Sequence, residues 1–212
     1  MQLTAKGRAT RARIVEAASR LIFERGVAGT SLDDVKVSAD VSSSQLYHYF
    51  ADKAALVSAV VVHQVNSVLD GQAPHLSKLG GMAALRAWRN ALVAIRRELK
   101  CEGGCPIGSL VSELAESDAK LRGEVAAGFR RWEASIGDGL RTMQARGELR
   151  EDADVDSLAT AILAAAQGGI LLTQAHRTTV PLEIALDAML DHVESFLTAR
   201  GKRARHPRRR TP

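Results

Sequence analysis

The side chains of residues 42–53 are the ones in this chain most able to make specific polar contacts. The hydrogen-bonding residues among them are Ser42, Ser43, Ser44, Gln45, Tyr47, His48 and Lys53. They are short or amphipathic and carry little negative charge, which suits hydrogen bonds to base edges and phosphates better than proton transfer. The major groove of DNA is wide enough to admit one helix with such a surface.

Two helix starts surround this surface. Thr30 stands three residues before Asp33, and Ser42 stands three residues before Gln45. This is the spacing of a hydroxyl that caps a helix and of its reciprocal partner. Because only residues 39–41 separate the two helices, the spacing predicts a helix-turn-helix in which the second helix crosses the first.

A small shared core is expected to hold these two helices together. Its predicted members are Leu32, Val35, Val37, Val41 and Leu46. Lys53 follows at the next helix start, where its ammonium and the free N–H groups can meet a phosphate. Capped short helices also occur in ordinary helical cores, so burial of the whole stretch is the alternative.

Chemistry of other kinds finds little support in this sequence. There is no G-x-S-x-G elbow, no Gly-rich phosphate loop and no metal-spaced histidine cluster, so we predict no enzyme, no cofactor and no metal site. Cys101 and Cys105 are separated by three residues, which is not the C-x-x-C spacing of a zinc ribbon or a thioredoxin loop. We interpret them as structural thiols, with a redox switch as the alternative.

The rest of the chain shows the three-to-four-residue periodicity of helices and no alternating strand pattern, which predicts an all-α fold of about nine helices. A long fourth helix is expected over residues 52–70. Gly and Pro predict breaks in the helical pattern at residues 71–74, 80–81, 103–106 and 178–181.

The last two long helices are predicted to form a dimer interface. Small residues are frequent between residues 156 and 174, and apolar residues recur at near-heptad spacing between 182 and 196. Two helices from each subunit would make a four-helix bundle about a two-fold axis. The predicted interface residues are Ile162, Ala166, Ile170, Leu186, Met189, Val193 and Phe196. The alternative is that both helices are buried within one subunit.

The helices between residues 81 and 146 could line an apolar chamber for a small apolar or aromatic effector. The candidate ligand-binding residues are Trp88, Leu92, Leu110, Leu114, Phe129 and Trp132, with Gln167 as a polar partner. A stripe of this kind at helical spacing is also typical of a plain core, which is the alternative.

Charge is unevenly distributed along the 212 residues, whose net charge is +5. Segment 201–212 is strongly basic and contains no acid, so the remainder is slightly acidic; we expect a solvated, disordered tail there, with a weak hold on DNA as the alternative. Basic residues before Glu16 predict an N-terminal arm that reaches along DNA. No apolar run resembles a membrane span or a signal peptide, so we expect a cytoplasmic protein with no membrane partner.

Residues 10–61 resemble the DNA-binding domain of the TetR family of bacterial repressors. The stretch contains FERGV, then TSLDDV, then VSSSQLYHYF and finally DKAAL. The resemblance implies that Thr30 and Ser31 contact phosphate, that residues 43–48 lie in or beside the major groove, and that Lys53 clamps the backbone. Asp40 departs from the Gly that the family usually has in this turn, but Asp tolerates a left-handed backbone better than most residues.

The resemblance also implies the organisation of the whole protein. Residues 1–62 would be the DNA-binding domain with its basic arm, residues 63–200 the ligand-binding and dimerisation domain, and residues 201–212 the tail. A homodimer would bind a palindromic operator on double-stranded DNA and release it when the effector binds. Residues 101–118 resemble the LmrA/YxaF-like branch, which implies an aromatic or drug-like inducer. A helical adaptor that binds another protein and no DNA is the alternative.

Overall fold

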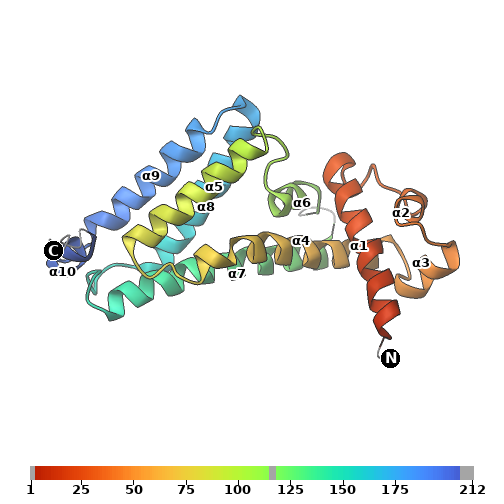
Figure 1. Cartoon of the computed structure of the whole chain (residues 1–212), viewed down its shortest axis with the longest axis horizontal. Helices are drawn as coiled ribbons and strands as arrows, with labels where there is room; N and C mark the ends of the chain where they lie inside the picture. Colours follow the sequence, from red (N-terminus) through yellow and green to blue (C-terminus); the bar gives the residue numbers. More distant parts are fainter. Residues whose placement is uncertain (1–2, 115–117, 206–212) are drawn as a thin grey trace, which may run out of the picture. The chain divides into compact units, whose positions relative to one another are not determined.

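The computed structural model describes residues 3–114 and 118–205, and every regular element in these ranges is a helix (Figure 1). The fold class is therefore all-α, as expected from the periodicity. The ten helices are α1 (Ala5–Arg25), α2 (Leu32–Ser38), α3 (Ser43–Tyr49), α4 (Lys53–Leu76), α5 (Met82–Glu98), α6 (Pro106–Leu114), α7 (Ala119–Ala145), α8 (Val155–His176), α9 (Val180–Ser195) and α10 (Ala199–Arg205).

The chain divides into two compact units, each with its own internal contacts. The first unit contains residues up to Asp70 together with Pro106–Phe129, and the second contains Gly71–Cys105 and the residues from Arg130 onward. Helices α4 and α7 each contribute residues to both units. The domain boundary predicted near residue 62 falls within α4.

Helix α4 is longer than the sequence predicted. The expected break at residues 71–74 is wrong, because α4 continues to Leu76 with Pro74 inside its last turn. Burial outweighs the low helix propensity of Gly and Pro here. Gln72 and Leu76 are both buried, and Gln72 accepts a hydrogen bond of 2.9 Å from the indole N–H of Trp88. The breaks expected before α5, α6 and α9 are present.

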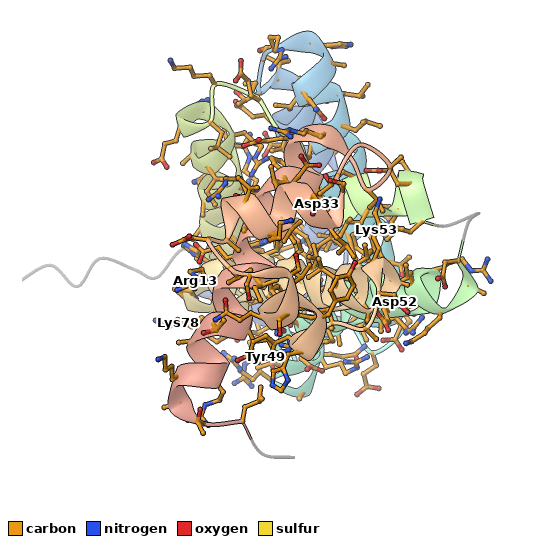
Figure 2. The ribbon with its side chains drawn as sticks, turned by 90° about the vertical axis from the view of Figure 1, so that its right-hand side faces the viewer. Arg13, Asp33, Tyr49, Asp52, Lys53 and Lys78 are labelled. Atoms are coloured by element: carbon orange, nitrogen blue, oxygen red, sulfur yellow. The ribbon has the colours of Figure 1, made fainter. Side chains whose placement is uncertain are left out.

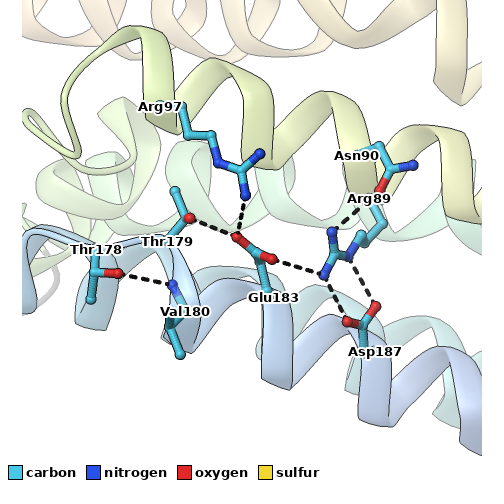
Figure 3. A network of polar contacts seen from close by, with 8 residues as sticks. All are labelled: Arg89, Asn90, Arg97, Thr178, Thr179, Val180, Glu183 and Asp187. Atoms are coloured by element: carbon cyan, nitrogen blue, oxygen red, sulfur yellow. Dashed lines mark hydrogen bonds and ion pairs between the residues drawn. The ribbon is translucent and has the colours of Figure 1, made fainter.

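The second unit is built around the antiparallel pair α8 and α9. Gly169 of α8 lies so close to Leu182 that an added Cβ would be 2.8 Å from the Leu182 Cα. The small residues of α8 therefore permit close packing within the subunit. Helix α5 packs against α9, and ionic contacts join these two helices (Figure 3).

Three arginines of α5 bind four acids of α9. Arg89 holds Asp187 through two hydrogen bonds of 2.9 and 2.7 Å and also reaches Glu183 at 3.4 Å (Figure 3). Arg97 donates to Glu183 at 2.8 Å. The third arginine completes the row further along α9, where Arg86 pairs with Asp191 and Glu194.

The C-terminal segment begins with a helix that the sequence did not predict. The disordered tail was expected from residue 201, but α10 spans Ala199–Arg205, and this brings the described helices to ten rather than about nine. Gly201 lies against the carbonyl of Glu148, where an added Cβ would be only 2.3 Å away. This close approach, which only glycine allows, docks α10. The remaining tail residues, 206–212, lie outside the described part of the chain.

Two helices contradict the expectation that no apolar segment approaches the length of a membrane span. By length and composition alone, α4 and α8 could each cross a membrane. For α8 the packing explains the composition, because Leu158, Ile162 and Leu163 are buried in the second unit. The apolar residues that a core helix needs for packing raise its hydropathy just as the lipid-facing residues of a membrane helix do.

Candidate nucleic-acid interface

The supporting helix of the predicted helix-turn-helix begins one residue later than expected. Ser31, not Thr30, is the N-cap of α2: its hydroxyl accepts the N–H of Asp34 at 3.1 Å, while the Asp34 carboxylate accepts the N–H of Ser31 at 2.9 Å. Thr30 is 3% exposed, and its hydroxyl donates to the carbonyl of Gly26. The predicted cap at Thr30 is therefore wrong, and Ser31 is the exposed hydroxyl at this helix start.

The second helix start is confirmed. Ser42 caps α3, with its hydroxyl accepting the N–H of Gln45 at 3.2 Å and the Gln45 carbonyl oxygen accepting the N–H of Ser42 at 2.9 Å. The second of these bonds ties the side chain of Gln45 to the helix start. Its amide nitrogen therefore points away from the capping bond and is the part of Gln45 most available to a ligand.

The turn between α2 and α3 has the left-handed residue that the sequence suggested. Asp40 has φ +49°, a conformation that Asp adopts more readily than most residues. Arg13 of α1 supports this turn by donating to the carbonyls of Ala39 at 2.9 Å and Asp40 at 3.4 Å. The guanidinium therefore satisfies carbonyls that end α2 and would otherwise lack a partner.

The core under the turn differs from the predicted one. Val35 and Leu46 are buried as expected, but Val37 is 77% exposed. Ala39 and Phe50 are buried in its place. The reason is the shortness of α2, because a helix of two turns covers its partner with one narrow face and Val37 lies on the other.

The outer surface of α3 is polar and accessible. Tyr47 is 56% exposed, and Ser43, Ser44 and His48 are exposed as well. The rings of His48 and Tyr49 meet edge to face, with centroids 4.9 Å apart. Burial of the whole stretch, the alternative left open by the sequence, is therefore wrong for α3.

Lys53 lies beside the start of α2. It is the first residue of α4, and its side chain is labelled in Figure 2. It lines a small hollow of the first unit together with Thr30, Ser31 and Leu32. The N–H groups at this helix start are not all free, because the carboxylate of Asp52 accepts the N–H of Ala55 at 2.7 Å. The Lys53 ammonium is therefore the group at this helix start that is most available to a phosphate.

The predicted basic N-terminal arm is part of a helix instead. Helix α1 begins at Ala5, with Thr4 as its N-cap. Arg11 stacks over the ring of Phe50 at 5.1 Å, and Arg13 supports the turn as described. The charge of these arginines suggested contacts with DNA, because charge alone carries no information about intramolecular partners.

Arg20 was missed for the same reason. Its guanidinium donates to the hydroxyl of Ser38, the last residue of α2, at 2.9 Å. With Arg13 and Arg20 seven residues apart on α1, the two lie on one face of that helix. This spacing was the available signal for their role in orienting α2.

The candidate ligand-binding residues fall into both compact units. Leu110, Leu114 and Phe129 belong to the first unit, and the others belong to the second. In the second unit the indole of Trp88 is satisfied by Gln72. The buried Nε1 of Trp132 and the Nε2 of Gln167, in contrast, have no hydrogen-bond partner among the described residues.

The predicted dimer residues are mostly covered within the subunit. Five of the seven side chains are buried: Ile162, Ala166, Ile170, Leu186 and Val193. Met189 and Phe196 are partly exposed. The large apolar side chains that remain exposed on α8 and α9 are Leu171, Leu172, Val180 and Ile184.

Family models match both parts of the chain. The model described as bacterial regulatory proteins, tetR family, matches residues 14–60, which include the whole helix-turn-helix. The model described as tetracyclin repressor-like, C-terminal domain, matches residues 81–189, about half of the chain.

Individual proteins are similar over nearly the whole length. The transcriptional repressor DhaR of Mycobacterium sp. (strain GP1) is 26% identical over 190 residues, covering 88% of this chain and 95% of DhaR. A crystal structure of a TetR transcriptional regulator from Chloroflexus aurantiacus J-10-FL has a TM-score of 0.77 at 26% identity and covers 92% of this chain and 98% of its own.

YxaF of Bacillus subtilis, which represents the branch suggested by residues 101–118, is 24% identical over 82% of this chain and 89% of YxaF. Because DhaR is at least as similar, the branch stays a prediction. The family consists of DNA-binding transcriptional regulators and not of enzymes. By its helix-turn-helix, its C-terminal domain and its all-α fold, this chain belongs to the TetR family of bacterial transcriptional regulators.

Proposed function

We propose that this TetR-family regulator is a cytoplasmic repressor whose dimer binds a palindromic operator and releases it when a small apolar or aromatic effector binds. The observation that carries the proposal is the exposed face of α3, where Tyr47, His48 and two serines stand on a helix fixed by its capping box and by the Arg13-supported turn. A rigid, accessible helix of this kind can enter a major groove. The description of the relative DhaR as a repressor supports the direction of control.

Direct reading of the operator would depend on few side chains. The serines offer hydroxyls that accept or donate with little discrimination, and Gln45 already uses its carbonyl oxygen in the capping box. A bidentate contact to adenine needs both ends of an amide, so Gln45 would donate through its nitrogen alone. Tyr47 is then the largest exposed group on α3, and DNA shape would supply part of the specificity.

Phosphate contacts would come from residues around the hollow at the starts of α2 and α4. Lys53 and Ser31 are among the residues around this hollow, and the Lys53 ammonium and the exposed Ser31 hydroxyl would hold one backbone from the side. Thr30 is buried in the same place, so a contact from its backbone is more consistent with the structure than one from its hydroxyl.

Dimerisation would use the outer face of α8 and α9. Leu171 and Ile184 are 65% and 64% exposed, and exposed apolar side chains of this size on neighbouring helices favour an interface. The seven residues expected from the sequence would support these helices from behind, with Met189 and Phe196 at the margin. A two-fold axis through this face would present two α3 helices to a palindromic site.

The effector is expected to carry a hydrogen-bond acceptor. Buried donors without a partner are rare in folded proteins. Among the described residues of the second unit, Arg86 and Thr173 have one, and so do the candidate ligand-binding residues Trp132 and Gln167. An apolar or aromatic molecule with a carbonyl, ether or similar oxygen would satisfy them. Leu92 and Trp88 of the same unit would add apolar contacts.

Control would operate through the spacing of the two DNA-binding heads. An effector that binds better when α4 is tilted favours the dimer whose heads do not match successive grooves, so operator affinity falls by the difference in binding free energy. The test is a gel-shift titration of DNA from upstream of the gene, with footprinting of the bound site. A symmetric footprint supports the proposal, and no shift at low salt would favour a helical adaptor that binds protein instead.

A further inference from the structure

The connection between α5 and α6 carries two cysteines, and Arg96 bonds to both of its ends. The N–H of Cys101 donates to the backbone carbonyl of Arg96 at 2.8 Å. The side chain of Arg96 turns to the other end of the connection, where its Nη1 donates to the carbonyl of Gly104 at 2.6 Å. This carbonyl belongs to the peptide that joins Gly104 to Cys105. Arg96 therefore holds both cysteine-bearing ends of the loop.

Arg96 differs from the other arginines of α5 in its charge partners. Arg89 and Arg97 bind carboxylates of α9, whereas no ion pair to a carboxylate is formed by Arg96 among residues 3–114 and 118–205. Burial lowers the pKa of Arg96, and the neighbouring thiols of Cys105 and Cys101 oppose this shift. The guanidinium stays charged, with two sulfurs as its acidic neighbours.

The loop itself is tightly folded. Lys100, Cys101, Gly103 and Gly104 all have positive φ, between +51° and +79°. Gly104 packs against the side chain of Gln174 of α8, where an added Cβ would be 2.5 Å from the amide oxygen. Cys105 is partly exposed, whereas Cys101 is 7% exposed. The two thiols therefore differ in access to solvent and share one cation.

We propose that Cys105 and Cys101 form a peroxide-responsive thiol pair in which Arg96 promotes attack by Cys105. The Cys105 thiolate attacks one oxygen of a peroxide, the O–O bond breaks, and hydroxide or alkoxide leaves, so that Cys105 becomes a sulfenic acid. The Cys101 thiol then attacks the sulfenic sulfur, a disulfide forms, and water leaves. The peroxide is reduced by two electrons and the thiol pair is oxidised by two.

The disulfide would act on DNA binding through α6, a step that rests on the proposed function. Cys105 directly precedes Pro106, the first residue of α6. At the other end of α6, the carboxylate of Glu113 accepts the N–H of Val27 at 2.5 Å, just after α1. Within the first unit this bond ties α6 to the helix that carries Arg13 and Arg20. Rearranging the loop before α6 would change the position of Glu113 and so of α1.

The thiol chemistry is tested without DNA. Reduced protein is treated with hydrogen peroxide and mapped by mass spectrometry under non-reducing conditions, with an expected loss of two hydrogens in a peptide pair joining Cys101 to Cys105. Cys101→Ser should instead give a sulfenic acid at Cys105 that dimedone traps. Cys105→Ser should leave Cys101 unmodified at the same dose. Equal modification of both thiols, or only disulfides between subunits, would overturn the proposal.

The role of Arg96 is tested by the pH profile of thiol alkylation. Arg96→Gln should slow iodoacetamide modification of Cys105 near neutral pH by about threefold to tenfold, with the rates converging at high pH. Arg96→Lys should restore part of the rate. Arg97→Gln, one residue further along the same helix, is the matched control and should leave the profile unchanged. Identical profiles for Arg96→Gln and the native chain would remove Arg96 from this role.

The regulatory step is tested on the same preparations. Peroxide should weaken operator binding by the native chain but not by the double variant Cys101→Ser, Cys105→Ser. Before peroxide is added, the double variant and the reduced native chain should bind the operator with equal affinity. A disulfide that forms without any change in operator affinity would refute the regulatory link alone. A chain that binds no operator even when reduced would refute the proposed function, while the thiol result would stand.

Discussion

Single side chains on α3 decide how this regulator would read DNA. The capping box uses the side-chain oxygen of Gln45, and the neighbouring serines are short, so Tyr47 extends furthest from the helix among the exposed groups. A tyrosine ring offers apolar contact to a thymine methyl and a hydroxyl for a phosphate or base edge. Most of the discrimination expected from α3 therefore depends on one ring.

Replacing Tyr47 should weaken operator binding selectively. We expect Tyr47→Ala to cost about 1–3 kcal/mol of operator binding free energy, measured by fluorescence anisotropy at fixed salt. Val37→Ala is the control, because Val37 is also exposed but lies on α2. Equal affinities of the native chain and Tyr47→Ala for the operator would remove this residue from the groove.

Lys53 should behave differently, because a phosphate contact carries no sequence information. Lys53→Ala should lower affinity for operator and unrelated DNA by the same factor and should reduce the slope of log K against log salt by about one. The neighbouring Asp52→Asn is a useful counterpart, since removing its carboxylate should strengthen binding to both DNAs. A loss confined to the operator would contradict this assignment.

At the scale of elements, ionic contacts join α5 to α9. Glu183 accepts hydrogen bonds from the Thr179 hydroxyl at 2.6 Å and from Arg97 and Arg89 (Figure 3). The Thr179 bond lowers the pKa of Glu183, and the two guanidinium charges lower it further. A lowered folded-state pKa means that the ionised carboxylate stabilises the fold.

The stability contributed by Glu183 should depend on pH with a definite sign. It should be complete above the ordinary glutamate pKa of about 4.3 and should be lost as the pH falls through the lower folded-state value. The melting temperature of Glu183→Gln, measured between neutral pH and pH 3, should therefore be lower than that of the native chain at neutral pH. The two melting temperatures should approach each other in acid. Glu98→Gln, an exposed change on α5, should track the native chain. A difference in melting temperature between Glu183→Gln and the native chain that stays constant with pH would contradict the lowered pKa of Glu183.

At the scale of the whole molecule, the feature that bears most on dimerisation is that α8 has two apolar faces. One face packs on α9 within the subunit, and the two helices together bury five of the seven residues first assigned to the dimer. The other face exposes Leu171 and Leu172, and α9 exposes Ile184 beside them in the same helix pair. Helices with two apolar faces are typical of a bundle that continues into a partner.

Charges placed on the outer face should separate the dimer without unfolding the subunit. Leu171→Glu with Ile184→Glu should give a monomer in sedimentation equilibrium, with helix content unchanged by circular dichroism and operator affinity strongly reduced. Ile162→Glu, which buries a charge inside the subunit, should unfold it instead. If the Leu171→Glu, Ile184→Glu protein is folded and still dimeric, the dimer interface lies on another surface.

Local interactions made several features predictable from the sequence. The Ser42 capping box involves residues three apart, the left-handed Asp40 lies in a three-residue turn, and Gly and Pro end helices through their own backbone limits. Each depends on neighbours in the chain. The helical class, the cap of α3 and the breaks before α5, α6 and α9 could therefore be predicted.

Other features depended on what each helix packs against, which spacing does not reveal. Pro74 stays inside α4 because Gln72 and Leu76 are buried in the second unit, and Val37 is exposed because α2 is short. Arg13 donates to the turn between α2 and α3. The period of 3.6 residues identifies an apolar stripe but not its partner. Only the tertiary structure decided that Ile162 and Leu186 face their own subunit while Leu171 remains exposed, because burial is a property of the surfaces that meet.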